Sequence, residues 1–171
     1  MRHMLELLED GGVGYMSEKK HNGWVRLMFE NWNSLGIYTQ SWKMDRLNYL
    51  IKHLDIDIIA GCECQTDWSF INTDHQFNSL LSPGSAKKGR VSHNITERIQ
   101  LDQMGGTAIT GVGRICDVIT EVGCDTTGLG RWSWLTLHGG STTTRIISAY
   151  LPRKPNRLSR GRTVWEQHSR Y

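Results

Sequence analysis

Asn31 and Glu63 are the residues whose types and spacing first indicate chemistry. Asn31 follows an apolar run that begins at Trp24, and Glu63 follows a second apolar run at 57–62. Each run predicts a core strand, and a buried strand delivers its last side chain to the carboxyl edge of a sheet. Amide and carboxylate oxygens are ligands that Mg²⁺ accepts. The pair therefore indicates a magnesium site at this edge.

The segment between the two runs predicts a helix. Apolar residues recur at intervals of three and four between Ser41 and Leu54, which is the pattern of one helix face packed on a sheet. Ser41 can accept a backbone N–H bond at the helix start. The order strand, helix, strand then brings Asn31 and Glu63 to neighbouring strand ends.

A third candidate, Tyr150, closes the last of four short runs that alternate with turn signals. The runs lie at 107–110, 116–122, 131–137 and 144–150. Their spacing predicts an antiparallel meander packed under the first strands. The phenol of Tyr150 is expected at a strand end, as are the side chains of Asn31 and Glu63.

The middle of the chain contains less regular segments. We predict a third strand at 76–81. Segment 83–102 has little apolar periodicity and predicts an exposed loop. Trp132 and Trp134 lie two residues apart and share a strand face, where a buried pair is favoured over a base-stacking platform.

Two basic segments are candidates for contact with phosphates. The loop at 83–102 carries Lys87, Lys88 and Arg90, and the last segment carries Arg153 and Lys154. Phosphate contact and simple solvation are both open for these segments, and solvation is favoured for the loop.

The composition indicates one globular domain. The chain has 171 residues with 38% hydrophobic content, enough for a core. A net charge of +3 and a pI of about 8.7 permit nucleic-acid binding without demonstrating it. For the four cysteines, reduced core thiols are favoured over a zinc site.

We interpret residues 1–23 as a flexible leader. Gly11–Gly14 lacks the lysine and hydroxyl that complete a phosphate-binding loop. Acidic residues stand where a signal peptide needs an apolar core, and no stretch approaches the roughly 20 apolar residues of a membrane span. We therefore expect an intracellular protein outside the membrane, with the compartment open.

Five segments in order resemble the first half of an endonuclease/exonuclease/phosphatase domain of the retrotransposon type. They are residues 29–35, 57–63, 105–109, 128–134 and 145–152. The resemblance covers 24–171 and implies the amino-terminal part of a DNase I-like α+β sandwich, with a mixed sheet and one or two flanking helices. It also implies Mg²⁺-dependent phosphodiester hydrolysis of nucleic acid, with DNA favoured.

In that family an Asn and a Glu hold the metal, a Tyr lies near the phosphate, and an Asp-x-Asn pair and an Asp-His unit follow. Asn31, Glu63 and Tyr150 match the first three, and Asn33 is a further catalytic candidate. No aspartate follows Asp125 in this chain. The resemblance therefore implies weak or absent hydrolysis by the isolated chain.

The same resemblance implies that the chain supplies only about one layer of the sandwich. We expect an uncovered apolar sheet face, with marginal stability, aggregation or reliance on a second chain or the missing carboxy-terminal half. A non-catalytic nucleic-acid-binding remnant is the main alternative function. A phosphatase acting on lipid or small-molecule phosphates shares the metal centre and ranks lower.

Overall fold

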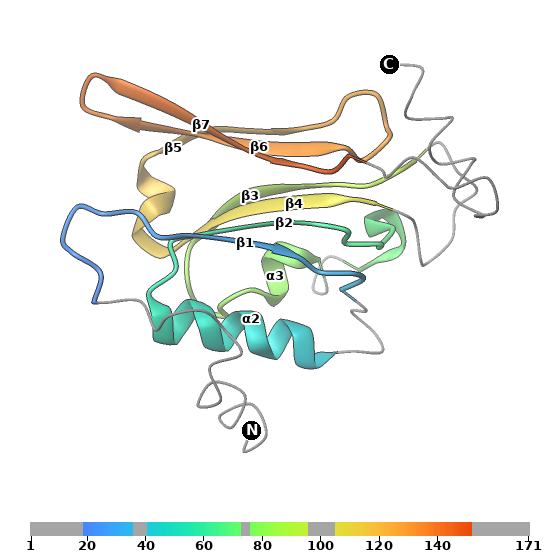
Figure 1. The fold of residues 1–171 in the computed structure, drawn as a ribbon, viewed down its shortest axis with the longest axis horizontal. Helices are drawn as coiled ribbons and strands as arrows, with labels where there is room; N and C mark the ends of the chain where they lie inside the picture. The colour runs from blue at the N-terminus through green and yellow to red at the C-terminus, as the bar shows by residue number, and fades with distance from the viewer. Residues whose placement is uncertain (1–18, 36–40, 73–75, 96–104, 152–171) are drawn as a thin grey trace.

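The computed structural model describes residues 19–35, 41–72, 76–95 and 105–151 (Figure 1). In chain order its elements are β1 (Leu27–Asn31), α2 (Ser41–Leu54), β2 (Ile58–Cys62), η1 (Trp68–Phe70), α3 (Phe77–Leu80), β3 (Lys87–Ser92), β4 (Thr107–Val112), η3 (Gly113–Asp117), β5 (Ile119–Cys124), β6 (Trp132–Gly139) and β7 (Thr142–Ala149). Among these residues no helix has the length and apolarity that crossing a membrane requires.

The strands form two sheets that lie one above the other (Figure 1). The first sheet has the order β1-β2-β4-β3 and the second the order β5-β6-β7. Strands β1 and β2 are parallel, and every other pairing is antiparallel. Helix α2 lies below the first sheet on the side away from the second. The predicted α+β class, with a mixed sheet and a flanking helix, is confirmed.

The strand–helix–strand prediction is confirmed in its main features. Helix α2 begins at Ser41, as predicted, and all five residues of β2 are buried. Strand β1 begins at Leu27, three residues later than the predicted run. Ile59 of β2 packs toward the helices with Leu47 and Phe77, so this face of the sheet forms the first core.

A second core lies between the two sheets. Ile58 of β2 and Ile109 of β4 pack there with Ile119 and Leu135 of the second sheet. The expectation that the chain supplies only about one layer was therefore wrong. Short runs rich in threonine and serine do form a covering sheet because each run places an apolar residue on the inner face.

The predicted strand at 76–81 is a helix, α3. Phe77 and Leu81 are both fully buried, and the N–H of Leu81 donates to the carbonyl of Phe77 at 3.2 Å. Two core residues four positions apart lie on the same face of a helix. In a strand, side chains alternate between faces, so Ser79, midway between them, would also have to face the core. The upstream loop is fastened by Gln76, whose amide donates to the carbonyls of Trp68 and Ile71.

The predicted exposed loop at 83–102 contains strand β3, so that prediction was wrong for residues 87–92, and residues 96–102 lie outside the described residues. Strand β3 pairs with β4 along its whole length. Gly89 permits the close pairing, because a Cβ there would lie 2.2 Å from the carbonyl oxygen of Ile109. An edge strand made of lysine, glycine and arginine carries no apolar alternation, which is why its sequence resembles a loop.

The predicted four-run meander is divided between the two sheets. Strand β4 belongs to the first sheet, and residues 116–117 lie in the short helix η3. Trp132 and Trp134 are partly exposed on the outer face of the second sheet, so the expectation of a buried pair was wrong. The guanidinium of Arg145 lies 4.1 Å from the ring of Trp134, and this contact covers the ring from solvent.

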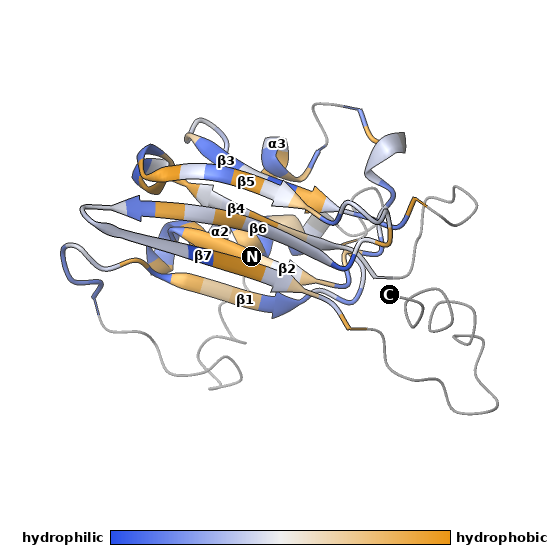
Figure 2. Ribbon diagram, turned by 90° about the horizontal axis from the view of Figure 1, so that it is seen from above, coloured by the Kyte–Doolittle hydropathy of each residue, from blue (hydrophilic) through white to orange (hydrophobic). Residues whose placement is uncertain are grey.

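An apolar ledge, defined here as Leu27 and Phe29, remains on β1. Both residues pair with β2 residues of the inter-sheet core and so face the second sheet. Figure 2 shows β5, β6 and β7 over the other three strands, with β1 outside them. Leu27 is 47% exposed and Phe29 is 55% exposed, because no described strand lies beyond β7.

Replacing the ledge with Leu27→Thr and Phe29→Thr is expected to reduce concentration-dependent self-association, measured by sedimentation velocity. The physical reason is that exposed apolar area drives association when two copies can bury it. Ile147→Thr is the matched control, because Ile147 is 57% exposed on the outer face of β7. Equal effects of the ledge variant and the control would show that the ledge is not the contact.

Candidate active site

One row of four paired residues crosses the whole first sheet. Asn31 pairs with Cys62, Cys62 with Thr107, and Thr107 with Ser92. Strands β1, β2 and β3 run in the same direction, so their carboxyl ends share this edge. The ends of β1 and β7 lie on the right-hand side of Figure 1. We call this edge, with the residues that follow it, the rim.

The pairing of β1 with β2 continues past both strand ends. The N–H of Trp32 donates to Cys62 O at 3.0 Å, that of Ser34 to Glu63 O at 2.9 Å, and that of Leu35 to Cys64 O at 3.0 Å. Adjacent strands lie about 4.8 Å apart. Asn31 and Glu63 therefore lie at the same end of two adjacent strands, β1 and β2, as predicted.

A tight turn follows Asn31 and involves Asn33. The side-chain oxygen of Asn31 accepts the N–H of Asn33 at 3.0 Å. Asn33 and Ser34 adopt positive φ values of 42° and 72°, which asparagine tolerates better than most residues. The side chain of Asn33 is exposed at the rim, so both amides stand at one edge.

Lys43 of α2 holds this turn from below. Its amine donates to the carbonyls of Trp32 at 2.8 Å, Asn33 at 3.0 Å and Ser34 at 2.5 Å. The residue pattern around Ser41 did not single out Lys43 as a positioning residue. A signal was present, because a lysine in the first turn of a helix opposes the helix dipole and needs another reason to be there.

Glu63 is half-buried at a sharp change of direction. Its φ is 55°. The backbone after it is hydrogen-bonded to Gly105 and Gly106, the two residues that precede β4. The N–H of Gln65 donates to Gly105 O at 2.8 Å, and that of Cys64 to Gly106 O at 3.4 Å. Gly105 and Gly106 have φ values of 85° and 86°, a conformation that favours glycine.

Tyr150 reaches the same rim from the second sheet. Its N–H donates to Arg131 O at 2.7 Å, and a Cβ added to Gly105 would lie 2.9 Å from its ring. Burial raises the pKa of Tyr150, and the negative charge of Glu63 and a smaller contribution from Cys62 raise it further. The phenol is therefore protonated at neutral pH. Its ring lies beside Gly105, whose carbonyl accepts the N–H of Gln65, two residues after Glu63.

The segment 128–134, one of the five segments that resemble the family, supports Tyr150 through a backbone hydrogen bond. Buried Asp125 accepts the N–H groups of Thr127 and Arg131, each at 2.8 Å. This turn positions the Arg131 carbonyl that receives the Tyr150 N–H. The segment therefore supports the site through the backbone.

A polar pair that no sequence pattern predicted lies beside the rim. Nε2 of His93 lies 3.3 Å from Oδ1 of Asp67, and Asp67 also accepts the N–H of Ser69 at 2.9 Å. Burial lowers the pKa of His93, and the Asp67 charge partly opposes that effect. The pair went unnoticed because His93 was expected in a loop.

The basic residues of β3 are mostly engaged in the fold. Lys87 donates to Leu81 O at 3.0 Å, and Lys88 reaches across to Ile119 O in the second sheet at 2.5 Å. Both lie at the end of β3 away from the rim, and Arg90 is exposed nearer to it. The predicted contacts Arg153 and Lys154 lie outside the described residues.

The donor types at the rim fit Mg²⁺, but their number is small. Asn31 and Glu63 offer an amide oxygen and one carboxylate, where Mg²⁺ is usually held by one or two carboxylates, water and substrate phosphate. Within the described ranges no three His, Cys, Asp or Glu residues gather as a metal group. Buried Cys62 and Cys64 have raised thiol pKa values, mainly through burial, which favours their interpretation as core thiols.

Comparison with known proteins assigns no family to the chain. No family model matches the sequence, and no curated protein matches it. The rim geometry therefore carries the functional inference.

Gly61→Ala is expected to destabilise the protein by about 1–3 kcal/mol, the usual cost of overpacking. A Cβ there would lie 2.5 Å from the buried ring of Trp32 and 2.6 Å from Glu30 O. Urea denaturation measures the change. Gly139→Ala is the control, because nothing lies within 4 Å of its added Cβ. Equal stability of the two variants would contradict this packing.

Glu63→Gln is expected to lower the pKa of Tyr150 without restoring its ordinary value of about 10. The charge of Glu63 is removed, whereas burial, the larger cause, remains. NMR titration of ring-labelled tyrosine in metal-free buffer measures the shift. Glu121→Gln, a change in the exposed partner of Arg145, should leave the titration unchanged. If the Tyr150 pKa is unaltered in the Glu63 variant, the Glu63 carboxylate does not act electrostatically on the Tyr150 phenol.

Proposed function

We propose that this chain carries the opening part of a Mg²⁺-dependent phosphodiesterase domain of the endonuclease/exonuclease/phosphatase type, with a DNase I-like fold and nucleic acid, favouring DNA, as substrate. One observation carries the proposal. Asn31 and Glu63 leave paired strand ends, and the Tyr150 ring lies beside Gly105, which is hydrogen-bonded to the backbone just after Glu63. The ordered resemblance of five segments supports the same interpretation.

Each residue at the rim has a role that phosphodiester hydrolysis requires. Glu63 and Asn31 would hold Mg²⁺, which when bound neutralises charge on the phosphate. Tyr150 remains protonated and can donate its O–H to a phosphate oxygen, which stabilises developing charge. The exposed amide of Asn33 supplies a further donor beside Asn31.

The proposal also accounts for what the described residues lack. Glu63 is the only carboxylate that we assign to the metal, and no general base has been identified among the described residues. The sequence has no aspartate after Asp125. An Asp-x-Asn pair and an Asp-His unit would complete the chemistry of a domain of this type, and we therefore infer that the chain alone hydrolyses nucleic acid slowly or not at all.

A non-catalytic nucleic-acid-binding remnant is the second candidate. The small donor set at the rim favours it, because one carboxylate and one amide do not make a tight Mg²⁺ site. The coding frame after Tyr171 separates the two candidates. Continuation into the two missing units supports the enzyme, and a stop codon supports the remnant.

Manganese, a paramagnetic substitute for Mg²⁺, tests the metal site directly. In NMR spectra of the labelled chain, trace Mn²⁺ should broaden the amides of residues 31–34, 63–65 and 150. Glu63→Gln should abolish this pattern, and Glu121→Gln should preserve it. Broadening centred elsewhere, or unchanged in the Glu63 variant, would remove the basis of the proposal.

A plasmid-cleavage assay with Mg²⁺ complements this measurement. We expect little nicking by the isolated chain. If the unchanged chain cleaves the plasmid rapidly and Glu63→Gln abolishes that cleavage, the metal site is supported. The same result would show that no further polypeptide is required.

A further inference from the structure

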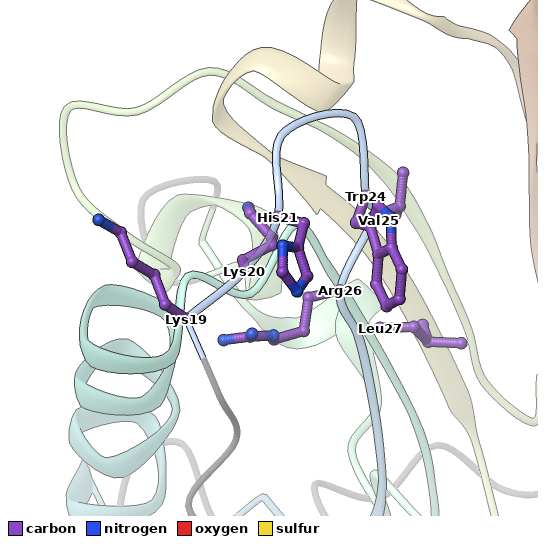
Figure 3. A pocket seen from close by; sticks show the side chains of 7 residues that line it. All are labelled: Lys19, Lys20, His21, Trp24, Val25, Arg26 and Leu27. Atoms are coloured by element: carbon purple, nitrogen blue, oxygen red, sulfur yellow. The ribbon is translucent and has the colours of Figure 1, made fainter.

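A pocket of about 410 Å³ lies at the amino end of β1, away from the rim. Figure 3 shows the side chains around it, which come from one continuous segment at 19–27. Four of the seven lining residues are basic and none is acidic. They are Lys19, Lys20, His21, Trp24, Val25, Arg26 and Leu27. The volume falls in the range of ligand pockets, roughly 300–1,000 Å³.

Contacts with the rest of the fold position the pocket walls. The Lys20 amine lies 2.8 Å from Oδ1 of Asp57 and donates to Asp55 O at 3.0 Å. The Arg26 N–H donates to Oδ2 of Asp57 at 2.7 Å, and its guanidinium donates to Leu54 O. These contacts tie the segment to the start of β2. The charge of Lys20 is offset by Asp57, and exposed Lys19 adds a further positive charge to the pocket.

Trp24 is the most exposed aromatic side chain among the described large hydrophobics, at 70%. It stands on a turn in which its N–H donates to His21 O at 3.2 Å. The His21 ring lies against it, with centroids 5.2 Å apart. The exposed indole offers a face on which a flat ring can stack, and exposed Lys19 and His21 lie near it in sequence.

An exposed indole with basic neighbours is the combination used to bind single-stranded nucleic acid. Bases stack on aromatic side chains and basic groups follow the phosphates. A duplex does not present its base faces in this way, and the Asp and Glu side chains of an acidic peptide have no flat ring to stack on an indole. Strand β1, which is five residues or roughly 16 Å long, lies between the pocket and the rim. A strand several nucleotides long can reach from the pocket to the rim.

We propose that this pocket binds one nucleotide of a single-stranded nucleic acid, with its base on Trp24 and its phosphate near Lys19 and His21. The inference rests on the proposed function for the class of ligand. It adds a second contact point that would hold a strand while its other end lies at the rim.

The test is binding of a fluorescein-labelled single-stranded oligonucleotide to the full chain, followed by anisotropy in EDTA. Trp24→Ala should weaken binding by about fivefold or more, the loss expected from one stacked base. Trp24→Phe should recover most of the affinity. Lys19→Ala should lower the slope of log affinity against log salt by about one.

Trp42→Ala is the matched control. Trp42 is 56% exposed on α2 and has the Lys43 amine 5.6 Å from its ring. The affinity of the Trp42→Ala variant for the oligonucleotide should lie within about twofold of that of the unchanged chain, since surface changes away from a site have small effects. Both tryptophans are exposed, so thermal melts should show that each variant folds.

Four outcomes would overturn the proposal, and three of them concern the strand itself. They are equal effects of the two tryptophan variants, absence of oligonucleotide binding, and equal competition by a duplex of the same sequence. If a mononucleotide competes as well as the strand, the ligand is a free nucleotide and the strand proposal fails. The metal-free buffer excludes the rim metal, so failure here and failure of the Mn²⁺ test are separate results.

Discussion

The parallel pairing of β1 with β2, continued beyond both strand ends, is the constraint on which the site depends. Three backbone hydrogen bonds join residues 32–35 to residues 62–64 after the regular strands end. They hold an amide and a carboxylate at one level although the chain positions are about thirty residues apart. Lys43 secures the turn on the other side through three carbonyls. Without this pairing, Asn31 and Glu63 would have no fixed relation.

The second sheet adds Tyr150 because it is held against β2 by specific contacts. Ser148 Oγ donates to Gly61 O at 2.7 Å between the sheets, and the Lys88 amine reaches Ile119 O from the other edge. A buried hydroxyl needs such a partner, so the contact also selects the sheet position. Tyr150, two residues later, is thereby placed beside Gly105, which is hydrogen-bonded to the backbone just after Glu63.

The two ends of β1 have different chemistry, and the strand connects them. Its carboxyl end presents Asn31 to the rim, whereas its amino end presents Trp24 and Arg26 to the pocket. Between them, Leu27 and Phe29 form an apolar ledge beside the open edge of β7. Under the proposed function a nucleic-acid strand would contact both ends, whereas the ledge between them is exposed among the described strands.

The sequence by itself determined the elements whose signals are local. The buried run of β2 and the 3.6-residue period of α2 specified both elements, and their order placed Asn31 and Glu63 at neighbouring strand ends. Tyr150 was also expected at a strand end. These predictions succeeded because burial on both faces or on one face leaves a direct pattern in the residue types.

Only the tertiary structure decided the remaining features, because they depend on partners distant in the chain. Strand β3 exists through pairing with β4, although its own residues resemble a loop. Trp132 and Trp134 face outward because Arg145 can cover an indole ring there. The approach of Tyr150 to Glu63 required the second sheet to pack on the first, and no local pattern encodes that packing.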